Sequence, residues 1–180
     1  MENIYKIAIP FIKKWEGFVP FYACSADRPT AGYGIRVDLR PDKLFGGITG
    51  ADLTEEFEKI YAKHKGNLRA INKELEKKYP NLITEEEAEQ DLYDALKYDY
   101  WEHFGSDLPH GLTDNQCAAL LSFVYNVGIT NFKRSTMFKY LKKGDFQRAG
   151  LEFKKWVYAG GKRLRGLVNR RADEEKLYYS

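Results

Sequence analysis

Residues 15–34 read WEGFVPFYACSADRPTAGYG and join an amphipathic helical segment to a region rich in glycine, proline and aromatic residues. Glu16 ends the helical segment, and Trp15, Phe18 and Phe21 are its apolar neighbours in the sequence. A carboxyl group among apolar side chains is poorly hydrated, which disfavours its charged form. Glu16 is therefore predicted to stay protonated near neutral pH and to donate a proton to a leaving oxygen, as cleavage of a glycosidic bond requires.

The rest of the chain predicts one short β-forming region followed by helices. Residues 18–48 contain short apolar runs between glycines and prolines, which favour a hairpin or a three-stranded sheet. Thr84 and Thr113 each begin a capping box, the usual start of a helix. The helix after Thr113 is apolar nearly all round and is expected to be the buried central one. Helices are expected over residues 3–16, from 52 or 54 to 64, and over 67–78, 84–104, 113–128, 135–143, 145–158 and 164–178.

Length and composition suit one globular domain, or two small lobes sharing a helix, and the order of the predicted elements indicates the α+β class, mostly helical. The 180 residues are 43% hydrophobic and 15% aromatic, enough for a sizeable core. No apolar run is long enough to span a bilayer, and Glu2 makes the N-terminus a poor signal peptide, so we expect synthesis in the cytoplasm. Cys24 and Cys117 are expected to be free thiols. The three histidines lack metal-ligand spacing, so we expect no metal and no cofactor.

Charge is unevenly distributed along the chain, although the formal net charge is only +3. Residues 131–171 carry thirteen basic and two acidic side chains, whereas acidic residues are prominent over 52–107. A basic half attracts polyanions such as nucleic acid, teichoic acid, anionic lipid or the peptide carboxylates of peptidoglycan. The alternative is a solvated helix face, and the interpretation favoured here is a surface that faces a polyanion.

Three motifs, in order, resemble those of the phage-type lysozymes, glycoside hydrolase family 24. The first is Glu16, Cys24 and Thr30 followed by the Gly-x-Gly of residues 32–34, with one residue fewer than usual between Glu16 and Cys24. The second is the central helix over 119–128, similar to the family's Ser-Phe-x-x-Asn-x-Gly segment. The third, residues 156–178, is similar to the family's C-terminal signature. The resemblance covers most of the chain, but residues 36–80 match poorly and look expanded.

The resemblance implies a lysozyme-like fold in which two lobes of a single domain, residues 1–180, flank a cleft. The small lobe, with the sheet and linking helices, is expected over about 17–80. The helical lobe is expected over about 1–16 and 81–180. Many relatives carry a histidine directly after the Gly-x-Gly, where this chain has Ile35 and Arg36.

The resemblance also implies roles for the residues of the first motif. Glu16 is expected to be the general acid, and a solvated glutamate at a helix end is the alternative. Thr30 is expected to bind and orient the attacking water through its hydroxyl, unless it is an ordinary strand residue. Cys24 occupies the position at which relatives with Asp are thought to position or deprotonate that water. The alternative is that Cys24 is a small packing side chain. Asp27 is a nearby carboxylate that could take the place of the missing Asp, although it does not occupy the family position.

Five further residues are predicted to bind substrate or support the site. Tyr22 and Tyr33 offer aromatic faces for sugars, although core packing is the expected role of at least one among them and Trp156. Gly32 lets the backbone approach a ligand closely. The resemblance implies that Arg170 reaches Glu16 and holds its orientation. Asn126 is expected to bind sugar or the cleft floor, unless it is satisfied within its own helix.

These observations predict a peptidoglycan hydrolase, an N-acetylmuramidase that cleaves the β-1,4 bond between N-acetylmuramic acid and N-acetylglucosamine. The alternatives are a lytic transglycosylase and a non-catalytic wall- or polyanion-binding module. The resemblance points to a monomeric phage or prophage endolysin, released from the host cytoplasm through a holin, and a secreted antibacterial effector is the other possibility. The expected partners are peptidoglycan glycan strands, with electrostatic contact to an anionic wall or membrane surface and no specific nucleic acid.

Overall fold

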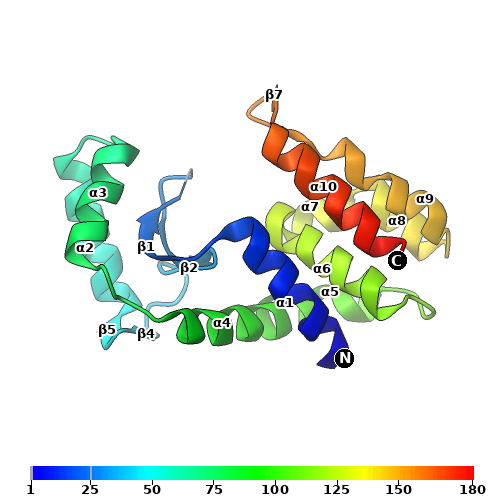
Figure 1. Cartoon of the computed structure of the whole chain (residues 1–180), viewed down its shortest axis with the longest axis horizontal. Helices are drawn as coiled ribbons and strands as arrows, with labels where there is room; N and C mark the ends of the chain where they lie inside the picture. Colours follow the sequence, from blue (N-terminus) through cyan, green and yellow to red (C-terminus); the bar gives the residue numbers. More distant parts are fainter. Residues whose placement is uncertain (1, 25) are drawn as a thin grey trace. The chain divides into compact units, whose positions relative to one another are not determined.

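The computed structural model of the chain describes residues 2–24 and 26–180, and within these ranges helices predominate over three small antiparallel sheets (Figure 1). The predicted class, mostly helical α+β, is thus confirmed. The contacts divide the chain into two compact units. The sheet unit comprises Glu16–Leu92, and the helical unit comprises the chain up to Trp15 together with Tyr93–Ser180. Within the described residues, no helix combines the length and the apolar character needed to cross a bilayer.

The sheet unit begins at the end of α1 (Glu2–Glu16), the predicted N-terminal helix. Gly17, with φ of +71°, follows the helix and leads into the strands. Three antiparallel strands in the order β1-β2-β3 then form the sheet, and β2 lies in its centre with all four residues buried. The strands are β1 (Val19–Ala23), β2 (Pro29–Gly32) and β3 (Ile35–Arg36).

After β3, the sheet unit continues with a second hairpin and two antiparallel helices. The hairpin is β4 (Leu44–Phe45) with β5 (Ile48–Thr49), and it leads directly into α2 (Gly50–Lys63). Thr49 caps α2 by accepting a hydrogen bond from the Asp52 N–H, so the cap lies earlier than the predicted Asp52 or Thr54. Thr49 is favoured because its hydroxyl reaches an N–H of the first turn, which has no partner within the helix.

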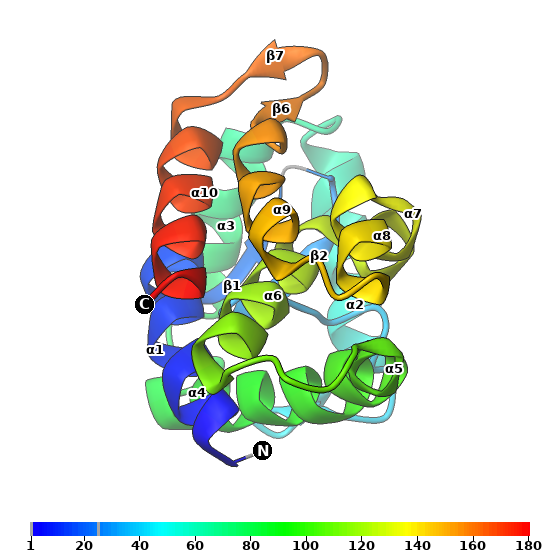
Figure 2. The same ribbon diagram turned by 90° about the vertical axis from the view of Figure 1, so that its right-hand side faces the viewer.

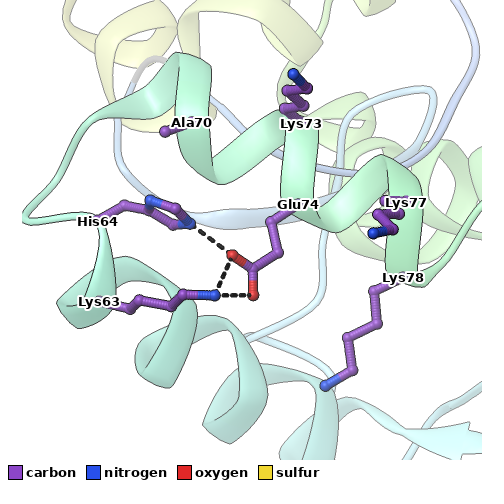
Figure 3. A pocket seen from close by; sticks show the side chains of 7 residues that line it. All are labelled: Lys63, His64, Ala70, Lys73, Glu74, Lys77 and Lys78. Atoms are coloured by element: carbon purple, nitrogen blue, oxygen red, sulfur yellow. Dashed lines mark hydrogen bonds and ion pairs between the residues drawn. The ribbon is translucent and has the colours of Figure 1, made fainter.

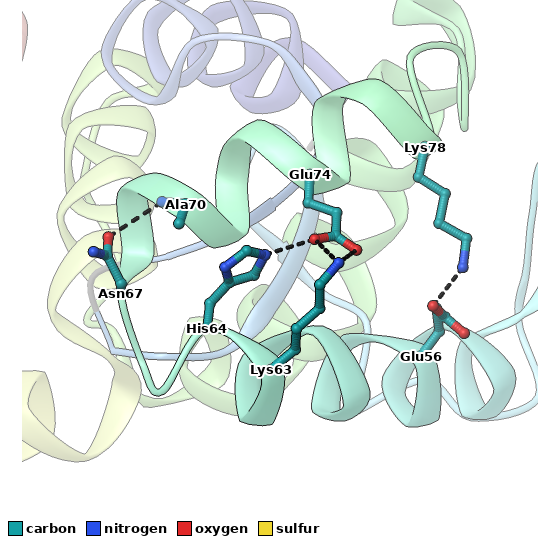
Figure 4. A network of polar contacts seen from close by, with 7 residues as sticks. All are labelled: Glu56, Lys63, His64, Asn67, Ala70, Glu74 and Lys78. Atoms are coloured by element: carbon teal, nitrogen blue, oxygen red, sulfur yellow. Dashed lines mark hydrogen bonds and ion pairs between the residues drawn. The ribbon is translucent and has the colours of Figure 1, made fainter.

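The helix α3 (Leu68–Lys78) runs beside α2 and is joined to it by ion pairs (Figures 1 and 4). Glu74 on α3 accepts hydrogen bonds from Lys63, at 2.7 and 2.9 Å, and lies 2.6 Å from Nε2 of His64. Toward the other end of α3, Lys78 pairs with Glu56 of α2. Apolar packing supports these pairs, because Ile71 and Leu75 of α3 are fully buried.

The long helix predicted from Thr84 is interrupted. The Thr84 capping box is present, since Thr84 and Glu87 each bond the other's backbone N–H. However, α4 (Glu85–Asp94) continues into the π-helical segment η1 (Ala95–Trp101). A π-helical turn adds a residue per turn and re-aims the side chains that follow it. The chain then forms α5 (Glu102–Phe104) and the 3₁₀ turn η2 (Gly105–Asp107).

The core of the helical unit is α6 (Asp114–Val127), as its apolar sequence predicted. Eight of its residues are buried, from Cys117 to Val124, and the capping box of Thr113 with Gln116 is present. The helix packs along α10 (Arg165–Tyr178), with α9 beside them (Figures 1 and 2). Phe123 of α6 makes edge-on ring contacts with three aromatic residues at centroid distances of 5.3–6.3 Å: Phe132, Phe153 and Trp156.

Between α6 and α10 the chain is more broken than its pattern indicated. The helix expected over 145–158 ends at Leu151, because the aromatic and β-branched residues of 156–158 favour extended backbone. A short hairpin of β6 (Tyr158–Ala159) and β7 (Lys162–Arg163) replaces its end and projects beyond the N-terminus of α10 (Figure 2). The other elements are α7 (Ile129–Arg134), α8 (Thr136–Lys142), α9 (Phe146–Leu151) and η3 (Phe153–Lys155).

Candidate functional site

Glu16 and Cys24 both lie within electrostatic reach of Tyr22. Burial raises the pKa of Tyr22 to about 12, and the negative charges of Glu16 and then Cys24 add smaller effects in the same direction. Glu16 is half-buried at the end of α1, and Cys24 is a half-buried free thiol one residue beyond β1. The structure therefore brings the predicted acid, the predicted thiol and a predicted aromatic residue into one neighbourhood of the sheet unit.

The carbonyl of Arg28 ties Cys24 to Thr30. It accepts a hydrogen bond from the Cys24 N–H at 3.0 Å and another from the Thr30 hydroxyl at 3.1 Å. The Asp27 N–H donates back to the Cys24 carbonyl at 2.9 Å, and Asp27 has a left-handed backbone with φ of 55°. We call this arrangement the Arg28 junction: the Arg28 carbonyl with Cys24 and Thr30 bonded to it. Two of its three groups, the Cys24 N–H and the Arg28 carbonyl, belong to the backbone, and the third is the Thr30 hydroxyl.

Thr30 lies on the central strand with its side chain 2% exposed. Its cross-strand partners are Tyr22 on β1 and Arg36 on β3, so the three side chains share one face of the sheet. The Thr30 hydroxyl uses its hydrogen on the Arg28 carbonyl, and its oxygen retains lone pairs that can accept a hydrogen bond. An acceptor at this position suits the predicted role of orienting a water molecule.

Arg36 is a charged residue of this face that our sequence analysis did not assign to the site. Its Nε donates to Asp38 at 2.6 Å, and a second guanidinium nitrogen bonds the other carboxylate oxygen. This pairing raises the pKa of Arg36 and holds the pKa of Asp38 below its usual range. Arg36 lies opposite Thr30 in the pairing of β3 with β2, and residues opposite each other share a face of the sheet. This pairing is the signal that would have placed Arg36 beside Thr30.

Gly32 and Tyr33 support the sheet from inside the protein. A Cβ added to Gly32, whose φ is +61°, would lie 2.8 Å from the Cβ of Ala88 on α4. The close approach expected for a ligand is therefore made by a helix of the protein itself. Tyr33 is only 2% exposed and donates its hydroxyl hydrogen to Glu85 at 2.5 Å, so its ring packs in the core and does not face a sugar.

Asn126 and Arg170 lie in the helical unit: Arg170 belongs to a buried network around Glu174, and Asn126 is an exposed residue at the edge of that network. Arg170 donates from Nε to Glu174 at 3.2 Å and from Nη2 to the Ser122 carbonyl at 3.4 Å. Asn126 accepts a hydrogen bond from Arg171 at 2.9 Å. These contacts hold both predicted side chains in place within their own unit. The predicted contact of Arg170 with Glu16, and that of Asn126 with sugar, stay predictions.

The Glu174 carboxylate is completely buried and surrounded by donors. It lies against Arg170 and Arg171, with Nε of Arg171 2.9 Å from Oε2, and the Ser122 hydroxyl donates to it at 2.8 Å. The guanidinium of Arg171 also stacks over Phe123, 4.9 Å from the ring centroid. A buried charge persists only when such partners compensate it, so this network joins α10 to α6. The i, i+4 spacing of Arg170 and Glu174 is the sequence signal for it.

Two cavities lie in the sheet unit, and the linings of both include none of Glu16, Cys24 and Thr30. One, of about 460 Å³, borders the chain segment of the Arg28 junction and the Asp38 carboxylate. The other, of about 540 Å³, lies between α2 and α3 (Figure 3). The first is lined by Ala26, Asp27, Arg28, Pro29, Asp38, Thr54, Phe57, Glu58 and Tyr61. The second is lined by Lys63, His64, Ala70, Lys73, Glu74, Lys77 and Lys78.

The histidine, cysteine and carboxylate side chains of the described residues provide neither a metal-binding cluster nor a disulfide. Across residues 2–24 and 26–180, no three histidine, cysteine or carboxylate side chains are grouped to hold a metal ion. Cys24 and Cys117 are both free, and Cys117 is buried. Burial raises the pKa of the Cys117 thiol to about 11. Near the Arg28 junction, the side chains predicted for the site offer a carboxyl group, a hydroxyl and a thiol.

Comparison with known proteins gives one consistent result. The family model described as "Phage lysozyme" matches residues 13–174. An endolysin of the Acyrthosiphon pisum secondary endosymbiont phage 1 is 31% identical over 183 residues, covering 99% of both chains. An endolysin of Bacillus phage B103 is 42% identical over 97 residues, which are 54% of this chain but only 36% of that protein. A P22 lysozyme mutant has a similar fold, with a TM-score of 0.66 at 24% identity over 96% of this chain and 95% of the other.

Proposed function

The chain belongs to the phage lysozyme family, and from this premise we propose that it is a glycosidase that hydrolyses peptidoglycan. The proposed target is the β-1,4 bond between N-acetylmuramic acid and N-acetylglucosamine. The sheet unit and the helical unit would be two lobes of one lysozyme-like domain over residues 1–180. The observation that carries the proposal is the Arg28 junction, which supports a water-binding hydroxyl and a thiol in the neighbourhood of the Glu16 carboxyl group.

Glu16 is the proposed general acid. As the bond between the sugar carbon and the bridging oxygen breaks, the Glu16 carboxyl group gives its proton to that oxygen and becomes a carboxylate. The sugar left behind has the character of an oxocarbenium ion. Tyr22, close to Glu16 and largely buried with a pKa of about 12, stays neutral at physiological pH and adds no competing charge.

Thr30 and Cys24 are the proposed holders of the attacking water. The water donates a hydrogen bond to the Thr30 oxygen, whose own hydrogen is used on the Arg28 carbonyl. The water oxygen bonds to the sugar carbon on the face opposite the leaving oxygen, which inverts that carbon. The proton released by the water passes to solvent, and the Glu16 carboxylate recovers a proton from solvent, so the cycle balances.

The supporting residues divide between the two units. Gly32 and Tyr33 fix the sheet against α4 in the sheet unit. Arg170, held by Glu174, is proposed to orient Glu16, and Asn126 is proposed to contact sugar or the cleft floor. Peptidoglycan glycan strands are the proposed partner, and the basic side chains of residues 131–171 are proposed to favour an anionic wall or membrane surface. We further propose that the protein acts as a monomeric endolysin in bacterial lysis, after release through a holin.

Digestion of purified sacculi tests the proposal. Hydrolysis at the proposed bond produces muropeptides with reducing N-acetylmuramic acid ends, which mass spectrometry distinguishes from the 1,6-anhydro ends of a lytic transglycosylase. Glu16→Gln keeps the size and removes the acid, so it should lower the rate by at least about 10²-fold, the usual contribution of general acid catalysis. Its circular dichroism and melting temperature should match those of the parent.

Three results would contradict the proposal in different ways. Anhydro ends would make the protein a transglycosylase. Binding to sacculi without any cleavage would make it a wall-binding module, the alternative that the basic half of the chain favours. Full activity of Glu16→Gln would remove Glu16 from the mechanism. Glu76→Gln, an exposed glutamate on α3, is the matched control and should keep full activity.

A further inference from the structure

Asn72, on α3, makes two hydrogen bonds with the backbone of Ala23 at the end of β1. The Ala23 N–H donates to Oδ1 of Asn72 at 2.6 Å, and Nδ2 of Asn72 donates to the Ala23 carbonyl at 3.2 Å. A side-chain amide offers one acceptor and one donor side by side, as the backbone of a neighbouring strand does. Asn72 therefore acts as a local substitute for a strand at the edge of the sheet.

The register of β1, an edge strand, against β2 explains why a substitute is useful here. Ala23 faces Pro29 across the sheet. The Cys24 N–H bonds the Arg28 carbonyl and the Val37 N–H bonds the Pro29 carbonyl, so Ala23 and Pro29 form a non-hydrogen-bonded pair in which the N–H and carbonyl of Ala23 point away from β2. An unpaired backbone group at the end of an edge strand leaves that end free to fray. Asn72 supplies both the donor and the acceptor for these outward-facing groups of Ala23.

The helix that carries Asn72 is itself firmly held. Glu74 joins it to Lys63 and His64 of α2, as Figure 4 shows. At the end of α3, the ring of Tyr79 packs edge-on against Phe21 of β1, with centroids 5.5 Å apart. The helix α3 is thus held by both α2 and β1. Because its own position is fixed, the Asn72 amide can fix the position of the Ala23 backbone.

The residue after Ala23 is Cys24, where the Arg28 junction begins. We propose that Asn72 is a positioning residue: by fixing the end of β1, it sets the place of Cys24 and, through the Arg28 carbonyl, of the Thr30 hydroxyl. The inference rests on the proposed function, because it proposes that α3, held by α2, positions residues for the same reaction. Asn72 acts through Ala23 and touches neither substrate nor water.

Two substitutions of Asn72 and one matched control test the proposal. Asn72→Ala removes both hydrogen bonds. Asn72→Asp keeps the acceptor for the Ala23 N–H but places a second oxygen against the Ala23 carbonyl. The control is Asn67→Ala on the same helix, where the side chain caps α3 by accepting from the Ala70 N–H and has no hydrogen bond with β1. A cap costs about 1 kcal/mol of stability, so the control separates a weaker α3 from a misplaced β1.

Two measurements are made on each variant in a Cys117→Ser background, which leaves Cys24 as the single thiol. The first is kcat and KM on soluble peptidoglycan fragments. The second is the rate at which an aromatic disulfide reagent labels Cys24, which reports the geometry of the junction without any substrate. In Asn72→Ala, we expect kcat to fall about 10-fold with KM little changed, because misplaced catalytic groups lose rate rather than binding. We also expect Cys24 to be labelled several times faster.

The outcomes separate this inference from the proposed function. Asn67→Ala should match the parent in both measurements, and Asn72→Asp should lie between the parent and Asn72→Ala. If Asn72→Ala changes kcat and labelling no more than Asn67→Ala does, the positioning role is wrong. If labelling changes while kcat does not, Asn72 holds the strand without serving the reaction, and the proposal is again wrong. If the parent cleaves no peptidoglycan, the proposed function fails, and the labelling rates alone decide whether Asn72 sets the junction.

Discussion

The two units hold their polar residues in opposite ways. In the sheet unit, the Arg28 junction is made by backbone atoms and one hydroxyl, and the thiol of Cys24 is left half-exposed. In the helical unit, Glu174 is fully buried, and its partners are two guanidinium groups and the Ser122 hydroxyl. The first arrangement leaves the Cys24 thiol partly exposed, whereas the second uses its charged groups on one another.

This difference predicts what each cluster contributes. A buried ion network holds helices in register, and removing one partner leaves the others desolvated and unpaired. A junction formed by backbone atoms survives the loss of a side chain, so a substitution there should change reactivity more than folding. Substitutions in the two units should therefore separate stability from activity.

The largest effect on folding is expected from Glu174→Ala. The change leaves the buried charges of Arg170 and Arg171 without their carboxylate, and losing one partner of a buried ion pair costs about 3–5 kcal/mol. Urea unfolding followed by circular dichroism measures this loss. Glu175→Ala, the next residue on the same helix, should lower the free energy of unfolding far less. Similar losses in the two variants would show that the network adds no stability of its own.

A smaller loss of stability is expected from Gly32→Ala, with Gly160→Ala as its matched control. Both glycines have positive φ, +61° and +55°, so both substitutions carry a similar backbone cost of about 1 kcal/mol. Only at position 32 does the new Cβ meet a neighbour, Ala88 on α4 at 2.8 Å, whereas nothing lies within 4 Å at position 160. Overpacking adds about 1–3 kcal/mol, so thermal unfolding should rank Gly32→Ala clearly below Gly160→Ala. Equal melting temperatures would mean that α4 yields without cost.

The parts of the fold that could be predicted from sequence are those set by local interactions. The capping boxes at Thr84 and Thr113 were found because their partners lie three residues away. The central helix α6 was found because its apolar residues cover nearly every face. Cap choice was harder, since Thr49 and Asp52 both suit the position and only the path of the β5 strand into α2 decides between them.

The contacts that shape the candidate site are set by distant parts of the chain. Asn72 meets Ala23 across 49 residues, and no periodicity in either segment indicates the pairing. The role of the Arg28 carbonyl is also invisible in the sequence, because any residue carries that atom. The residue types of the first motif predict a group near the sheet, but the carbonyl that connects Cys24 to Thr30 belongs to the backbone of Arg28.

Cys24→Ser should reduce the rate of wall hydrolysis more than it reduces stability. A hydroxyl replaces the thiol, and the backbone bonds of the junction remain, so we expect about a 10-fold loss in kcat and a nearly unchanged melting temperature. Cys24→Asp should stay active if this position helps to hold the water. Cys117→Ser is the control for replacing a thiol by a hydroxyl. The Cys117 thiol is buried and its pKa is raised to about 11, so in the parent it should stay unlabelled at pH 8. Equal rates for the parent and Cys24→Ser would make Cys24 a packing residue only.

The smallest effect is expected from Asp38→Asn, which removes the charge opposite Arg36. The pair is partly exposed, so its loss should lower the free energy of unfolding at pH 7 by less than about 1 kcal/mol. Because the pKa of Asp38 is lowered in the folded protein, its contribution is complete above the ordinary aspartate pKa of about 4 and is lost as pH falls through the lowered value. Urea unfolding at pH 7 and at pH 3 should therefore show a difference between parent and variant that shrinks at the lower pH. Asp42 is an exposed aspartate with no ion pair among the described residues, so Asp42→Asn should show no such difference. If the difference in free energy of unfolding between the parent and Asp38→Asn were larger at pH 3 than at pH 7, the assigned partnership with Arg36 would be contradicted.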